Sequence, residues 1–311
     1  MGRYFLKRLL LMIPVIFVTS FLIYAAMNMT SGDVALSLAP ENASDAQIEL
    51  IRKDLGLDQP FIVRYVKYMT GMLKGDLGVS YITGKDVFKT YMQRLPATME
   101  LAITSVLVSV FIAIPLGIYT AIHQNTWKDN LGMVFALFGV SMPNFWLGLM
   151  LMLFFSLNLG WLPSSGRHGF TSVILPALTV GLGLAALITR TTRSSMLDVL
   201  RQDYMTTARA KGANEKRVIF NHGLKNALIP IITVIGMQLS NVLTGSVLAE
   251  TVFSWPGVGR LIFDSISKRD TPMVTGAIIM SCVLMSIVNL LVDFVYAFFD
   301  PRIKAQYVKK K

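Results

Sequence analysis

The chain has 311 residues, of which 53% are hydrophobic and only 15% are charged. Soluble domains carry about 25% charged residues, so this composition excludes an ordinary soluble protein and is typical of one that crosses a membrane several times. The single cysteine, Cys282, excludes a framework of disulfides within the chain and a metal site built from cysteines. The net charge is +11, and in a membrane protein its placement predicts the orientation, because Lys and Arg concentrate on the cytoplasmic side.

Six apolar stretches reach the length of about 20 residues that a bilayer crossing requires. The first follows three basic residues, but it is longer than the 7–15 residues or so of a signal-peptide core, so we expect a transmembrane helix. The third lies in an uncharged region, residues 130–166, and holds Pro143, which predicts a kinked helix that ends near residue 159. The predicted spans are residues 9–29, 101–122, 131–159, 173–189, 227–249 and 274–296.

Six spans place both ends of the chain on the same side of the membrane. With the N-terminus inside, the cytoplasmic pieces are residues 1–8, 123–130, 190–226 and 297–311. These pieces hold 17 Lys or Arg and 5 Asp or Glu, whereas the outer pieces hold 12 and 10. We therefore predict an all-α, multi-pass protein of the cell membrane with both termini in the cytoplasm.

The segment between the first two spans is predicted to be a small helical insertion on the outer face. Ser44 and Gln47 form a capping-box pattern before an apolar periodicity that stops at Gly56, and Pro60 opens a second helix that closes at Gly75. The expected organisation is a first span to residue 30, an insertion over residues 31–97, a core over residues 98–299 and a basic tail over residues 300–311.

The sequence has no pattern typical of an enzyme active site. It contains neither an HExxH motif nor a GxxxxGK[ST] phosphate-binding loop, and its three histidines are scattered over loops. The centres of the six spans carry no charge, which argues against an ion-coupled carrier, although sodium sites of neutral oxygens remain open. We expect no catalytic residue, metal or cofactor in this chain, and if it transports against a gradient, the energy comes from another subunit.

Polar side chains within the spans are the candidates for lining a substrate path. In the fifth span Gln238, Asn241 and Gly245 share one helical face. The alternative is that such residues form hydrogen bonds between helices, worth about 0.6–2 kcal/mol each. The candidate path residues are Asn144, Gln238, Asn241, Thr244, Ser286 and Asn289.

The cytoplasmic loop of residues 190–226 holds eight Lys or Arg and three acids, and is far longer than a turn requires. Met196, Leu197, Leu200, Tyr204 and Ala208 form a helical apolar stripe. Next, Gly212 is suited to end this helix and Asn214 to cap a second one, whose apolar side would hold Val218 and Ile219. A rigid pair of helices of this kind can transmit force, and the alternative is an amphipathic segment that lies on anionic lipid.

The stretch TTARAKG at residues 206–212, followed by HGLKNALIP, resembles the cytoplasmic "EAA" loop of binding-protein-dependent ABC importer permeases. In this form it is similar to the B-type permeases of the dipeptide and oligopeptide (peptide/nickel) subfamily. Other matching stretches lie along the whole chain: GDLGVS at 75–80, RLPATMEL at 94–101, SMPNFW at 141–146, TRSSM at 192–196, ETVFSWPGVGR at 250–260 and DPR at 300–302.

The resemblance implies the type I ABC importer transmembrane-domain fold and a heterodimer with a second permease. It further implies two partner ATPases that bind ATP and Mg inside, a solute-binding protein outside, and alternating access for peptides, with no nucleic acid involved. Nickel or glutathione are alternative cargoes, and a lipid-binding structural membrane protein is an alternative from another class. The residues expected to contact the ATPases are Thr206, Thr207, Ala208, Arg209, Ala210, Lys211, Gly212, Ala213 and Asn214.

The stretch around Trp255 lies outside the membrane in the predicted topology. Its stiff Trp-Pro-Gly sequence suits a gate or a contact for the binding protein, and the alternative is a membrane-surface anchor, a common use of interfacial Trp. The residues concerned are Glu250, Phe253, Trp255, Pro256 and Gly257.

Overall fold

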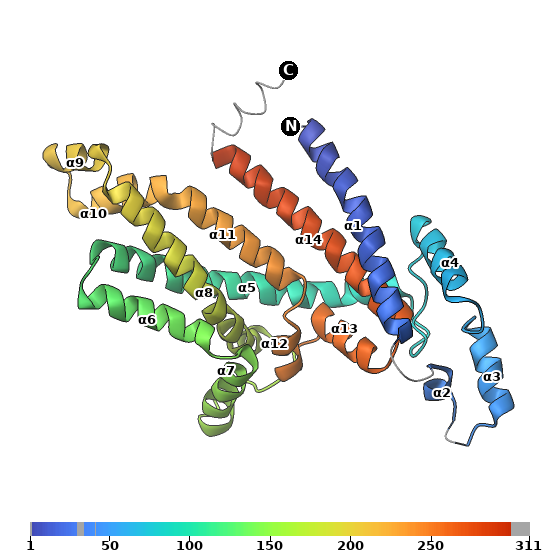
Figure 1. Ribbon diagram of the computed structural model, residues 1–311. Helices are drawn as coiled ribbons and strands as arrows, with labels where there is room; N and C mark the ends of the chain where they lie inside the picture. Colours follow the sequence, from blue (N-terminus) through green and yellow to red (C-terminus); the bar gives the residue numbers. More distant parts are fainter. Residues whose placement is uncertain (1, 30–33, 41, 300–311) are drawn as a thin grey trace. The chain divides into compact units, whose positions relative to one another are not determined.

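The computed structural model describes residues 2–29, 34–40 and 42–299, and this part of the chain is almost entirely helical (Figure 1). Five of its helical stretches are long and apolar enough to cross a membrane: Leu10–Met29, Val87–Ile122, Phe170–Leu200, Glu215–Leu243 and Thr271–Val292. A sixth candidate consists of Trp127–Ser141 and Asn144–Asn158, which are bent by 97° relative to each other. The all-α class is therefore confirmed, while the predicted tail of residues 300–311 lies outside the described residues.

The chain divides into two compact units, and the first comprises Met1–Thr98 with Pro256–Ser286. In this unit α1 packs through Tyr24 against three rings of α4, with ring centroids 5.6–5.7 Å apart. The capping box is confirmed, since the Ser44 amide donates to Gln47 Oε1 at 2.9 Å. The helices of this unit are α1 (Gly2–Met29), α2 (Val34–Leu38), α3 (Asp45–Asp54), α4 (Phe61–Leu73), α13 (Val258–Ser267) and the first parts of α5 (Val87–Ile122) and α14 (Thr271–Phe299).

A buried acid fixes the loop that follows α4 in the first unit. Asp270, which is 3% exposed, accepts hydrogen bonds from the Tyr81 amide at 3.0 Å and from the Ser80 hydroxyl. Burial, more than any charge nearby, raises the pKa of Tyr81 to about 12. The loop is thus tied to the residue just before α14.

The second unit comprises Met99–Trp255 with Ile287–Lys311. Its central element is α8, which packs against α6, α7 and α11. Two glycines allow α8 to approach its neighbours closely. A Cβ on Gly181 would lie only 2.8 Å from the Ser105 carbonyl oxygen of α5, and a Cβ on Gly139 of α6 would lie only 2.7 Å from the Leu182 carbonyl oxygen of α8, so neither position has room for a side chain. Besides the remainders of α5 and α14, the unit contains α6 (Trp127–Ser141), α7 (Asn144–Leu151), η1 (Met152–Asn158, a π-helix), α8 (Phe170–Leu200), α9 (Asp203–Ala210), α10 (Glu215–Arg217), η2 (Val218–Leu224, a π-helix), α11 (Lys225–Leu243) and α12 (Val247–Val252).

Three predicted element ends differ from the structure. Helix α5 begins at Val87 rather than at residue 101, because buried positions recur at helical spacing on both sides of residue 97. The predicted division between residues 97 and 98 lies inside this helix and next to Thr98, where the first compact unit is divided from the second. Helix α8 continues to Leu200, so the first part of the predicted loop is a helical extension of the span. The fifth span ends at Leu243, and Gly245 at φ +113° separates it from α12, so Gly245 does not share the helical face of Gln238.

Candidate functional site

The predicted pair of short helices after the fourth span is present. We call residues 203–217 the elbow: α9, a turn and α10, which continues through η2 into α11 (Figure 1). Gly212 has φ +77° just beyond the end of α9, a conformation that glycine adopts without steric cost. The Asn214 side chain accepts the Lys216 amide at 3.2 Å and so caps α10. The turn between the helices is therefore built by the two residues that the sequence indicated.

One methionine anchors the elbow to the rest of its unit. All eight residues of α9 are described, and Met205 is the buried one among them, at 0% exposure. A Cβ on Gly223 would lie 3.2 Å from Met196 Cε and 3.5 Å from Met205 Cε, so both methionines pack over this glycine of η2. Val218 is buried too, as predicted. These side chains make the elbow a packed element rather than a loose loop.

The predicted apolar stripe is wrong at Tyr204, whose side chain is 42% exposed. The helix is interrupted at Arg201 and Gln202, between α8 and α9. The interruption changes the helical phase, so Met205 rather than Tyr204 turns toward the core. A strict 3.6-residue periodicity across the whole stretch could not predict this change of register.

The side of the elbow that faces away from the rest of its unit is polar and solvent-accessible. Arg209 Nη2 lies 3.0 Å from Glu215 Oε1 and thus bridges α9 and α10. The hydrogen bond that Arg209 donates to this carboxylate raises the pKa of Arg209, and an exposed pair of this kind contributes about 0.2–1 kcal/mol. Of the nine residues predicted to contact a partner, Ala208 and Ala213 are partly buried and seven are exposed: Thr206, Thr207, Arg209, Ala210, Lys211, Gly212 and Asn214.

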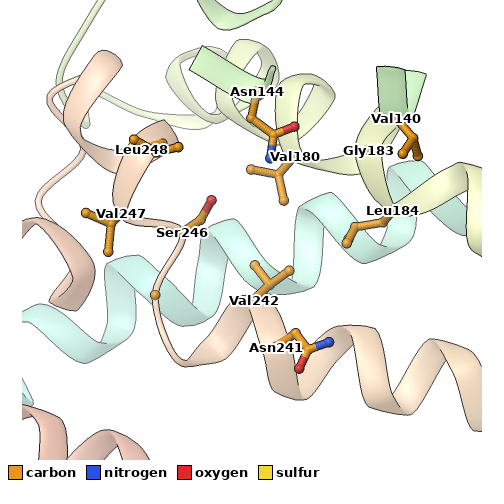
Figure 2. A pocket seen from close by; sticks show the side chains of 11 residues that line it. Val140, Asn144, Val180, Gly183, Leu184, Asn241, Val242, Ser246, Val247 and Leu248 are labelled. Carbon is orange, nitrogen blue, oxygen red and sulfur yellow. The ribbon is translucent and has the colours of Figure 1, made fainter. Parts of the chain in front are cut away.

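A cavity of about 530 Å³ opens between α6–α8 and the α11–α12 break in the second unit (Figure 2). Two of the predicted path residues, Asn144 and Asn241, line it from opposite sides. Asn144 stands at the start of α7, directly after the bend, and an ideal Cβ on Gly183 would lie 3.1 Å from its Oδ1. The remaining lining residues are Val140, Val180, Gly183, Leu184, Val242, Gly245, Ser246, Val247 and Leu248.

The other predicted path residues are not in the lining of this cavity. Gln238 Oε1 accepts a 3.3 Å hydrogen bond from the side-chain Nδ2 of Asn241, whereas the hydroxyls of Thr244 and Ser286 donate to backbone carbonyls of their own helices. Asn289 Oδ1 accepts a hydrogen bond from the Ser240 hydroxyl at 2.7 Å and so ties α14 to α11. This residue therefore follows the alternative prediction, that a polar side chain in a span bonds to a neighbouring helix instead of lining the path. Sequence reasoning missed the apolar lining and Ser246, because apolar residues in a span carry no sign of which face they occupy.

The stretch around Trp255 is packed into the protein. Trp255, Phe253 and Glu250 are each 0–1% exposed, and the Trp255 amide donates to the Glu250 carbonyl at 2.8 Å. A Cβ on Gly148 of α7 would lie 3.1 Å from the Phe253 ring, and the Gly166 amide donates to the Phe253 carbonyl at 2.9 Å. The alternative of a membrane-surface anchor is wrong for Trp255, because a fully buried ring cannot reach lipid head groups.

Comparison with known proteins agrees with this architecture. Residues 113–305 match the family described as binding-protein-dependent transport system inner membrane component, and residues 1–102 match the N-terminal component of the same system. The chain belongs to this family. It is therefore the permease subunit of an ABC importer, a multi-pass inner-membrane component that is itself non-catalytic.

Named relatives and solved structures are similar over most of their length. The glutathione transport system permease protein GsiC of Salmonella typhimurium strain LT2 is 42% identical over 98% of this chain and 99% of its own, and that of Escherichia coli strain K12 is 41% identical over the same shares. An inward-facing structure of the MetNI methionine ABC transporter covers 68% of this chain and 97% of its own, with a TM-score of 0.58 at 15% identity. The structural likeness shows the fold, that of type I ABC importer permeases.

Proposed function

We propose that this permease pairs with a second, homologous permease to form the path for short peptides, glutathione among them, that an external solute-binding protein delivers. The similarity to permeases named for glutathione transport supports this cargo class, because glutathione is a tripeptide. The cavity supports it as well, since about 530 Å³ falls within the roughly 300–1,000 Å³ of ligand sites. Its polar groups are the neutral Asn144, Asn241 and Ser246, which can hydrogen-bond to amides without holding a charged cargo in place.

We further propose that the elbow is where the two partner ATPases transmit their closure to the permease. The observation that carries this proposal is that the elbow has a buried anchor, Met205, and an exposed polar tip around Lys211 and Gly212. A displacement of the tip is then passed on to α8 and α11 rather than absorbed. The excess of Lys and Arg in the same pieces of the chain supports a cytoplasmic position for the elbow and for both termini.

We propose a gating role for the stretch of Glu250, Phe253, Trp255, Pro256 and Gly257 at the outer end of the path. Phe253 packs on Gly148 of α7, four residues after Asn144, while α12 contributes Val247 and Leu248 to the cavity. A movement of α7 or α12 would therefore change the packing of Phe253 and the width of the cavity together.

The test is uptake by the complete transporter, reconstituted in vesicles with its cognate binding protein, second permease and ATPases. Labelled glutathione and a labelled dipeptide are compared in the wild type and in Gly212→Leu. A Cβ at residue 212 would meet no atom within 4 Å, but the substitution imposes φ +77° on a residue with a side chain. The cost is about 1–2 kcal/mol, and the turn can relieve it by changing its shape. We expect an assembled complex whose uptake per ATP hydrolysed falls about tenfold, within the roughly 5–150-fold range of allosteric coupling.

Gly56→Leu is the matched control, because Gly56 has φ +65° and no atom within 4 Å but lies in the predicted outer insertion. It should strain the backbone equally and leave coupling unchanged. Full coupling in Gly212→Leu would refute the role of the elbow, and uptake of neither glutathione nor dipeptide by the wild type would refute the cargo class.

A further inference from the structure

An ion pair in the second unit ties the start of α6 to residues 190–200 of α8, the part that leads to the elbow. Arg193 donates from Nε to Asp129 Oδ1 at 2.7 Å and from Nη2 to Oδ2 at 2.6 Å, which is a two-point contact. The Asn125 amide, in a residue at φ +62°, donates to the same carboxylate at 3.1 Å. The Asp129 side chain is 3% exposed and that of Arg193 is 25% exposed.

Such a pair resists rotation as well as separation. Two parallel N–H···O bonds fix the guanidinium plane relative to the carboxylate, so a rotation of residues 190–200 of α8 against α6 strains this contact. A buried carboxylate that loses its cation is left with an uncompensated charge, which keeps the two helices together far more firmly than an exposed pair would. The pair is therefore suited to a constant link, not to a contact that opens easily.

Glycines on either side of the ion pair bring the backbones together. A Cβ on Gly117 of α5 would lie 2.6 Å from Thr192 Cβ and 2.8 Å from the Thr189 carbonyl oxygen, both on α8. A Cβ on Gly132 of α6 would lie 2.4 Å from Thr120 Cγ2 on α5. The end of α5, the start of α6 and the extension of α8 thus form one close-packed block, and Arg193 and Asp129 close it.

The two helices joined by this pair both reach the cavity. Helix α6 ends at Ser141, just after Val140 of the lining, and the bend then leads to Asn144. Helix α8 lines the cavity with Val180 and Gly183, and in the other direction it leads to the elbow. A rotation of the α8 extension that was not shared by α6 would move one wall of the cavity alone.

We propose that Arg193 and Asp129 are positioning residues for transport: they make α6 follow the movement of α8, so that a displacement of the elbow reaches both walls of the cavity at once. This inference rests on the proposed role of the elbow. It also assigns a role to Arg193 within the TRSSM stretch at residues 192–196, because this stretch lies outside the residues proposed to contact the ATPases.

The experiment uses the complete reconstituted transporter with Asp129→Asn and Arg193→Lys. The Asn side chain keeps the volume and loses the charge, and the Lys side chain keeps the charge but loses the two-point contact. Arg167→Gln is the matched control, because Arg167 Nη2 lies 2.6 Å from Glu100 Oε2 in a comparably short but more exposed pair, with side chains 43% and 30% exposed. Assembly is measured by co-purification of the ATPases, and coupling by labelled glutathione taken up per ATP hydrolysed.

We expect all three variants to assemble, with uptake per ATP lowered about tenfold in Asp129→Asn, lowered less in Arg193→Lys and unchanged in Arg167→Gln. The graded response of Arg193→Lys is the result that a purely structural role would not give. Wild-type coupling in both Asp129→Asn and Arg193→Lys overturns the proposal, and so does loss of assembly in both, which would make the pair a folding element alone. Gly212→Leu in the same preparation separates the two ideas: if it is uncoupled while Asp129→Asn is not, only the positioning role fails, whereas full coupling in Gly212→Leu refutes the elbow itself.

Discussion

Truncation of Met205 to alanine should release α9 from the rest of the permease. A helix of eight residues is too short to be stable alone in water, so α9 depends on its docking. Met205 is the buried side chain that provides this docking, and its partners Met196 and Gly223 belong to α8 and η2. Removing a fully buried methionine side chain costs about 2–5 kcal/mol. Because every 1.4 kcal/mol is about a tenfold change in an equilibrium constant, the population of undocked elbow should rise at least about thirtyfold.

Hydrogen exchange followed by mass spectrometry measures this population directly. In Met205→Ala the amides of residues 203–214 should exchange about thirtyfold faster or more, while those of α8 before residue 190 keep the wild-type rate. Trypsin should also cleave earlier after Arg209 and Lys211. Met237→Ala serves as the control, because Met237 is 57% exposed and its truncation leaves no buried cavity. Unchanged exchange over residues 203–214 in Met205→Ala would refute the anchoring role.

Two further substitutions test contacts within the second unit and within the first unit, respectively. Gly236→Ala should lower the thermal unfolding midpoint of the purified permease, because a Cβ would lie 2.4 Å from Val292 Cγ1 and overpacking costs about 1–3 kcal/mol; an unchanged midpoint would show that α11 and α14 separate easily. Asp270→Ala should destabilise the loop after α4 by about 1–3 kcal/mol, seen as earlier proteolysis at Lys85, because the Tyr81 amide loses its acceptor; wild-type proteolysis would contradict this.

Much of the helical architecture follows from local chemistry. Apolar runs of about 20 residues predict the spans, because a helix of this length crosses the apolar core of a bilayer. The capping pattern at Ser44 predicts the start of α3, because the capping side chains bond to backbone amides that have no partner within the helix. The turn of the elbow was equally accessible to sequence reasoning. Only glycine accepts φ +77° easily at residue 212, and an asparagine two residues later is a good cap.

The parts that sequence reasoning missed depend on contacts far apart in the chain. Nothing in the residues around Tyr204 shows that Met205 turns inward, because a break of two residues resets the helical phase. Likewise, the identity of Asn241 does not distinguish it from Asn289, although the first lines the cavity and the second bonds to another helix. The pairing of Arg193 with Asp129 joins residues that are 64 positions apart, and only the packing of α5, α6 and α8 brings them together.

The π-helical form of η2 absorbs one residue of chain length without a change in the direction in which the elbow points. Each residue added to or removed from an α-helix rotates everything beyond it by about 100°. Residues 218–224 join the elbow to α11 through wider turns, and π-helical segments accommodate one residue more than α-helical turns do. Loss of a single residue there would let the segment close into an ordinary helix and leave the exposed tip on the same side of α11. A one-residue deletion within α11 itself would instead rotate the whole elbow by about 100° relative to the rest of that helix, whereas a substitution at the exposed Phe220 changes one contact.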